Sequence, residues 1–125
     1  MTNTDVYRRF VDEIVVGKKL ELIDELFHPD CVLPIQKNLD GLKAQMAQQA
    51  QAYNVSVKYL HGLADGDWVI SHMALTIELA DGSKTAHIEE IECAHVVDEK
   101  IAEMWGVADV ASAFLQLGLP VPGHS

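Results

Sequence analysis

Residues 85–108 have the sequence TAHIEEIECAHVVDEKIAEMWGVA. Two runs rich in apolar and β-branched residues, 85–97 and 101–108, flank the short polar segment Asp98-Glu99-Lys100. Such runs, divided by turn-forming residues, are typical of β-strands that pair with each other. This stretch therefore predicts an antiparallel hairpin in the second half of the chain.

Two further runs of the same kind precede this hairpin, at residues 55–63 and 68–79. Their boundaries are marked by Asp65-Gly66-Asp67 and Asp81-Gly82-Ser83. Asp-Gly pairs favour tight hairpin turns, because glycine readily adopts the positive φ that these turns need. We expect residues 55–108 to form an antiparallel meander.

The first half of the chain has helical spacing instead. Val6, Phe10 and Ile14 recur on one face of a segment that Gly17 ends. The expected helices are residues 5–16, one from about residue 18 to the turn at residues 28–30, one that opens at Gly41, and a short one from about Asp109 to Gly118. The apolar run 31–35, which contains Pro34, suits an edge strand. Helices followed by a sheet indicate the α+β class.

The composition places limits on the partners of this chain. Its 125 residues are the size of one domain, and 49% hydrophobic residues are enough for a core. A formal charge of -10 repels phosphate backbones and anionic membranes, which argues against nucleic acid and membrane partners. The N-terminus lacks the features of a signal peptide, and no apolar stretch reaches about twenty residues. We expect a cytoplasmic protein.

The cysteines and histidines show no metal-site spacing. Cys31 and Cys93, without a secretory signal, are expected to be separate reduced thiols. The six histidines are scattered, with no HxH or HExxH pattern. The sequence therefore predicts neither a metal nor an organic cofactor.

Several segments carry a resemblance to a known family. The opening helices through Leu22-Ile23-Asp24-Glu25-Leu26-Phe27-His28-Pro29-Asp30, the segment 97–105 and the ending Leu115-Gln116-Leu117-Gly118 resemble SnoaL-like polyketide cyclases. These belong to the nuclear transport factor 2-like (cystatin-like) superfamily. The resemblance implies a single domain of this kind over residues 1–125, and the proline-containing tail at 119–125 is expected to be loosely ordered. It also implies N-terminal helices packed in the concave face of a strongly curved antiparallel sheet, a cone-shaped α+β barrel, and a homodimer.

The resemblance also implies two catalytic residues. In these cyclases an aspartate just after the last strand is a general base, and a histidine one hairpin earlier lies near it. Asp109 and His95 match these positions in motif context. Alternation along a regular strand places Trp105 and Asp109 on one face. On the preceding strand the same alternation groups His95 with His87, whereas Glu90 and Glu92 lie on the other face.

The remaining predicted site residues are candidates for binding the substrate: Trp105, Tyr7, His72, His87 and Trp68. Each has a structural alternative. Asp109 could cap the C-terminal helix, with or without acting as a base. The tryptophans could be core residues, Tyr7 could cover the helix interface, and His95 could be a partly exposed strand residue.

Two functions remain open. The first is a cofactor-independent, cyclase-like enzyme of the aldol type, or a related lyase, isomerase or hydrolase. It would abstract a proton beside a carbonyl of a small, largely apolar ligand, with Asp109 as the base. The second is a non-catalytic module of the same fold that binds a hydrophobic ligand or dimerises. An enzyme needs a second polar group to hold the developing charge, and His72, His87 or His95 would supply it.

Overall fold

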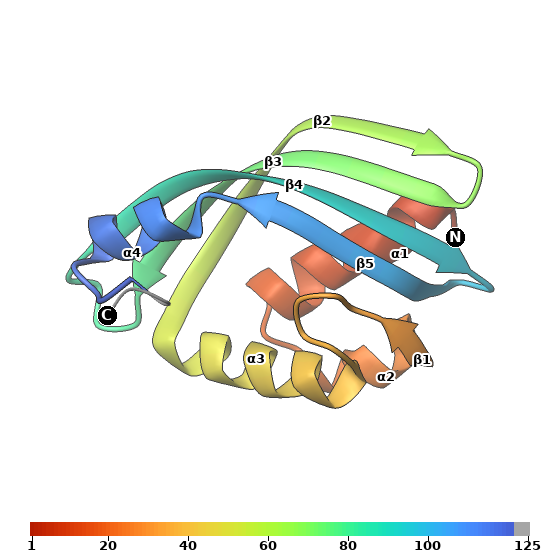
Figure 1. Cartoon of the computed structure of the whole chain (residues 1–125), viewed down its shortest axis with the longest axis horizontal. Coiled ribbons are helices and arrows are strands. Elements are labelled where there is room, and N and C mark those ends of the chain that lie inside the picture. Colours follow the sequence, from red (N-terminus) through yellow and green to blue (C-terminus); the bar gives the residue numbers. More distant parts are fainter. Residues whose placement is uncertain (122–125) are drawn as a thin grey trace.

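A five-stranded curved sheet forms the larger part of the fold, and the computed structural model describes residues 1–121 (Figure 1). In their order across the sheet, the strands are β1 (Phe27–Val32), β5 (Lys100–Ala108), β4 (Thr85–Val97), β3 (Trp68–Leu79) and β2 (Tyr53–Asp65). The strands from β2 to β5 form an antiparallel meander, and β1 pairs with β5 in parallel. The predicted α+β class with a curved sheet is confirmed, with one parallel strand added at the edge.

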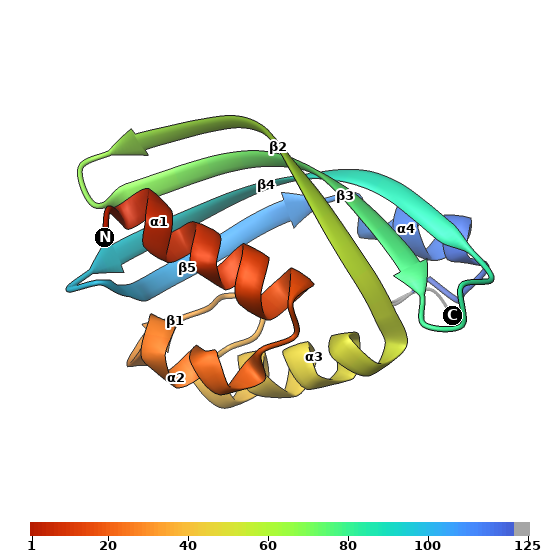
Figure 2. The same ribbon diagram turned by 180° about the vertical axis from the view of Figure 1, so that it is seen from behind.

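The N-terminal helices cover the concave face of this sheet (Figure 2). α1 (Asn3–Arg9) continues directly into a π-helix (Phe10–Val16), and together they form the helix predicted over residues 5–16. Their buried side chains pack in one core with side chains from the concave face of the strands. This burial of the apolar helix stripe is the main source of stability for such a layer.

The second helical segment is shorter than the pattern predicts. It consists of a 3-10 turn (Leu20–Leu22) and α2 (Ile23–Leu26), after which the chain is extended. The predicted turn at residues 28–30 is wrong, because the chain there is already extended. The predicted edge strand is confirmed, but as β1 (Phe27–Val32) it begins four residues earlier than residue 31. Pro29 is tolerated within β1 because this strand lies at the edge of the sheet.

α3 (Leu39–Ala52) lies opposite the curved sheet, on the far side of the core (Figure 2). Asn38 is its N-cap, and the side-chain oxygen of Asn38 accepts a hydrogen bond from the Gly41 amide at 2.9 Å. This cap satisfies an N–H group that the first turn leaves unpaired, so the helix begins two residues before Gly41. Leu42 and Met46 point into the core, and the chain turns directly into β2.

The last helix, α4 (Val110–Leu117), follows β5 and packs on β4. Gly118 ends it with a φ of 71°, the left-handed conformation that glycine adopts without steric cost. Leu119 is half-buried against the small cluster of Ala86, Ala113 and Leu117. The last part of the predicted loose tail, residues 122–125, lies outside the described residues.

Candidate active site

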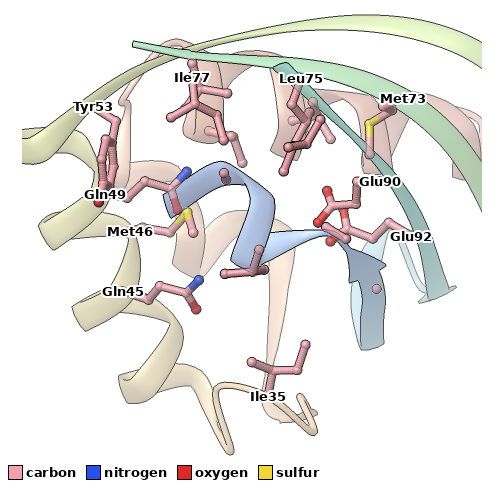
Figure 3. Close-up of a pocket in the computed structure, with 18 of the residues that line it drawn as sticks. Ile35, Gln45, Met46, Gln49, Tyr53, Met73, Leu75, Ile77, Glu90 and Glu92 are labelled. Atoms are coloured by element: carbon pink, nitrogen blue, oxygen red, sulfur yellow. The ribbon is translucent and has the colours of Figure 1, made fainter. Parts of the chain in front are cut away.

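A cavity of about 570 Å³ lies between the sheet, the π-helix, α3 and α4 (Figure 3). This volume is in the usual range of small-molecule sites. Its walls are largely apolar and include Leu75 and Ile77 of β3, Met46 of α3 and Met104 of β5. The fold therefore has room for a compact, largely apolar ligand.

Two carboxyl groups interrupt the apolar wall. Glu90 and Glu92 are two positions apart on β4, so their side chains lie on the same, concave face of the sheet. Both line the cavity. Figure 3 shows the two side chains next to each other, with Met73 above them. Acidic side chains are rarely placed in an apolar wall without a partner or a function.

Tyr7 of α1 supports this pair from the core. Its hydroxyl donates a hydrogen bond to Glu92 Oε1 at 2.7 Å and lies 3.6 Å from Met73 Sδ. The Tyr7 side chain is only 1% exposed. Burial and the charge of Glu92 raise the pKa of Tyr7, so the phenol stays protonated and remains a donor.

The surroundings favour the protonated form of Glu92. Burial, followed by the charge of Glu90, raises the pKa of Glu92 to about 8, although the Tyr7 hydrogen bond acts in the opposite direction. Burial also raises the pKa of Glu90. Two neighbouring carboxyls in a poorly solvated wall cannot easily both be charged, so the pair holds a proton near neutral pH.

Gly106 on the neighbouring strand lies next to Glu92. Gly106 of β5 is paired with Glu92 in the sheet. A Cβ at this position would lie 3.1 Å from the Ile91 carbonyl oxygen and 3.5 Å from Glu92 Oε2. The tight contact of such a Cβ is thus with the backbone of β4, and its contact with the carboxyl would be an ordinary van der Waals one.

Four of the predicted binding or catalytic residues lie on the convex face, away from the cavity. His95 stacks on Trp68 with 4.9 Å between ring centroids. His72 Nε2 is 2.8 Å from Glu89 Oε1, and His87 Nδ1 is 3.2 Å from Thr76 Oγ1. The expectation that these side chains point into the pocket is wrong, because β3 and β4 present the opposite set of alternating residues to the concave face.

Trp105 and Asp109 are placed at the margin of the site. Trp105 borders the cavity, but its side chain is 42% exposed and alternates with the inward-facing Met104 and Gly106. Asp109 is exposed, and its Oδ1 accepts a hydrogen bond from the Ser112 amide at 2.9 Å. The capping interpretation of Asp109 is confirmed, whereas its action as a base stays a prediction.

The sequence contained a signal for the carboxyl pair. Residues 86, 88, 94 and 96, which share the face of Glu90 and Glu92, are alanine, isoleucine or valine. This alternation is typical of a buried face. Two carboxyls within such a face mark a functional candidate, a signal that was outweighed by the motif match of His95.

No group of three or more His, Cys, Asp or Glu side chains within residues 1–121 is arranged to hold a metal ion. No helix in the same range has the length and apolar character to cross a membrane. The cytoplasmic location stays a prediction.

A comparison of the sequence with models of protein families gives a match to the SnoaL-like polyketide cyclase model over residues 5–117. The chain belongs to the SnoaL-like polyketide cyclase family. The predicted family is thus confirmed over almost the whole chain. No curated protein matches the sequence at a significant level.

Solved structures with the same fold extend beyond cyclases. A candidate polyketide cyclase from Bacillus cereus is 24% identical, with a TM-score of 0.80 over 94% of this chain and 80% of that one. A protein of ketosteroid isomerase-like fold from Catenulispora acidiphila is 15% identical, with a TM-score of 0.80 over 99% and 100%. An epoxide hydrolase from M. tuberculosis is 14% identical, with a TM-score of 0.75 over 92% and 88%. At these identities the likeness shows the fold alone, and the chemistry must be argued from the cavity.

Proposed function

We propose that this SnoaL-like protein is a cofactor-independent acid–base enzyme of the cyclase or isomerase type. It acts on a small, largely apolar molecule that contains a carbonyl group. The observation that carries the proposal is the Glu90–Glu92 pair in the apolar wall of the cavity, with Tyr7 bonded to one member. A family of cyclases supports this reaction class, and the pair supplies the groups that the chemistry needs.

The two carboxyls have complementary roles. Glu90, as the carboxylate, takes a proton from the carbon beside the carbonyl. The electron pair of the broken C–H bond forms the C=C bond of an enol, and the carbonyl oxygen receives a proton from Glu92. Enol formation is favoured because the acid and the base sit in a poorly solvated wall, where each has a pKa above its ordinary value.

Ring closure follows from the same intermediate. In a cyclase, the enol carbon attacks a second carbonyl of the substrate and forms a C–C bond. The π electrons of that carbonyl move to its oxygen, which takes the proton held by Glu90, while the enol O–H proton returns to Glu92. In an isomerase, the proton on Glu90 returns to a different carbon. The cavity holds both steps without a further group.

Glu92 is the acid in this scheme because its other oxygen is engaged. Tyr7 donates to Oε1, which leaves Oε2, the atom next to Gly106, to carry the proton. Tyr7 itself is a positioning residue, since it acts through Glu92. Asp109 is bonded to the backbone of α4, so the geometry favours the glutamates over Asp109 as the reacting groups.

Exchange of carbon-bound hydrogen tests this proposal without knowledge of the natural substrate. 2-Tetralone is a compact two-ring ketone with acidic protons beside its carbonyl, and NMR in D₂O follows their replacement by deuterium. We expect the wild type to accelerate exchange, and Glu90→Gln to lower the catalysed rate by roughly 100-fold or more, as expected for loss of a general base.

Two matched variants make the test specific. Asp109→Asn keeps the helix cap and removes the carboxylate, and Glu103→Gln removes a carboxylate from the convex face of β5. Both should exchange at the wild-type rate. Loss of exchange in Asp109→Asn with full activity in Glu90→Gln would restore Asp109 as the base and contradict the proposal. Binding of 2-tetralone with no exchange by the wild type would favour the non-catalytic module.

A further inference from the structure

The charges of the cavity wall are all of one sign. The described residues that line it include Glu90 and Glu92 but no lysine, arginine or histidine. An anionic ligand would find no counter-charge there and would meet the negative charge of the carboxyl pair. The wall thus disfavours free carboxylates and phosphates as ligands.

A second polar group of side chains lies across the cavity from the carboxyls. Gln45 and Gln49 are one turn apart on α3, and both line the cavity. Figure 3 shows their amides directed toward the space that Glu90 and Glu92 reach from the other side. Gln48 of the same helix and Tyr53, which follows it, also line the cavity, so the polar lining apart from Gln36 is divided between the carboxyls and the α3 side.

These amides are free to bind a ligand. Within residues 1–121, the hydrogen bonds made by glutamine side chains belong to Gln116, which contacts Ser112 and the backbone of His87. An amide both donates and accepts, so Gln45 and Gln49 match either a hydroxyl or a carbonyl. They do not supply the charge that would compensate an anion.

The region between the two ends is apolar. Figure 3 shows Leu75 of β3 over the space between the amides and the carboxyls, whereas Met46 lies beside the amides on α3 and Ile77 lies above Gln49. Burial of ligand surface against them favours a hydrocarbon or aromatic middle. The division into polar, apolar and polar parts defines the shape of a ligand.

We infer that Gln45 and Gln49 form a second hydrogen-bonding subsite opposite the carboxyl pair, so that the cavity selects an uncharged ligand with an apolar middle and a polar group at each end. The inference rests on the proposed function, since it takes this cavity as the active site. It adds to that function the recognition of the ligand's second polar group, which lies away from the reacting carbonyl.

Three related ketones test the subsite by calorimetric titration: 2-tetralone, 6-hydroxy-2-tetralone and 6-carboxy-2-tetralone. The hydroxyl compound should bind the wild type about 3- to 10-fold more tightly than 2-tetralone, as expected for one added hydrogen bond. The carboxylate should bind at least roughly 10-fold more weakly than 2-tetralone. In the double variant Gln45→Leu/Gln49→Leu the advantage of the hydroxyl compound should vanish. In Gln51→Leu, a residue of α3 that is not among those lining the cavity, it should persist.

A positive charge introduced at position 49 gives a test in which the expected result is tighter binding and not weaker binding. Gln49→Lys should improve the binding of 6-carboxy-2-tetralone by about tenfold or more, because it supplies the missing counter-charge. Equal affinities of the wild type for all three ketones would overturn the inference. So would a double variant that still prefers the hydroxyl compound together with a Gln49→Lys variant that binds the carboxylate no better than the wild type does. Deuterium exchange tests the proposed function independently of these affinities. If the wild type shows the expected binding preferences but catalyses no exchange, the subsite is supported and the proposed reaction is contradicted.

Discussion

Glu92 keeps its carboxyl among apolar groups, and this placement has a cost that depends on pH. Its pKa rises from the ordinary 4.5 to about 8 in the folded protein. Between these two values the folded state holds a proton that the unfolded state has lost. Folding stability contributed by this residue therefore falls as the pH rises from about 4.5 to about 8.

The first prediction concerns this pH dependence. Glu92→Gln resembles the protonated carboxyl and avoids the cost, so its stability relative to the wild type should increase from pH 5 to pH 8. The expected gain is on the order of 2 to 4 kcal/mol, following the size of the pKa change. Urea unfolding at a series of pH values measures it. Glu103→Gln is the control, and a Glu92→Gln difference that is constant with pH would contradict the assignment.

The second prediction concerns Tyr7. Its hydroxyl favours the charged form of Glu92, so Tyr7→Phe should raise the pKa of Glu92 further. The alkaline limb of the rate of 2-tetralone exchange should then move to higher pH, because Glu92 stays an acid over a wider range. Stability should fall by about 1 kcal/mol from the lost hydrogen bond. An unmoved alkaline limb together with the stability loss would reduce Tyr7 to a purely structural residue.

At the scale of elements, the junction between β5 and α4 provides the third prediction. Asp109 Oδ1 caps the helix at the Ser112 amide. Asp109→Ala should lower the free energy of unfolding by about 1 kcal/mol, and Asp109→Asn should be close to the wild type, because asparagine is also a good N-cap. Thermal or urea unfolding of the three proteins distinguishes them. An equal loss in both variants would show that the charge of Asp109, and not its cap, stabilises the junction.

The strands also show where prediction from the sequence succeeded and where it failed. The boundaries of the strands at residues 68–79 and 85–97 were predicted as observed, since Asp-Gly pairs mark the turns that precede them. The direction of the side chains was inverted, and His95 was placed in the pocket in place of Glu92. A strand pattern gives two faces but does not by itself say which is inside. Carboxyls in the buried set weaken the hydrophobic contrast that normally decides it.

The prediction for residues 28–30 was wrong for a different reason. The turn residues at 28–30 are ordinary signals of chain reversal, but the chain there is an edge strand held by β5. Pairing between segments more than seventy residues apart, such as Phe27 with Ile101, leaves no local signature. Tertiary contacts decide such a strand, and a local pattern cannot show them.

For the whole molecule, the fourth prediction is the homodimer. The convex face exposes apolar side chains on neighbouring strands, with Ile91 at 50%, Trp105 at 42% and Val107 at 68%. Adjacent apolar groups of this kind are common at interfaces between proteins. Sedimentation velocity should give a dimer for the wild type and a monomer for Val107→Lys, whose exposed position leaves the fold intact. A wild type that sediments as a monomer at all accessible concentrations would contradict the prediction.

The order of helices and strands and the family could be predicted from the sequence as a whole. The apolar periods, the turn residues and the matching segments at both ends of the chain all indicate one architecture. The small-molecule site stays a prediction. The residues of β4 that line the cavity could not be predicted, because they depend on which face of β4 curves inward.

The proposed mechanism requires that Glu90 and Glu92 share a proton at the pH where the protein works. Carbon-13 NMR of glutamate-labelled protein follows each side-chain carboxyl through a pH titration, in the wild type and in Glu92→Gln. We expect one carboxyl that titrates near pH 8 in the wild type and whose signal is absent from the spectrum of the variant. If every glutamate instead titrates close to its ordinary value of 4.5, the pair is fully charged at neutral pH and the proposed acid–base mechanism is contradicted.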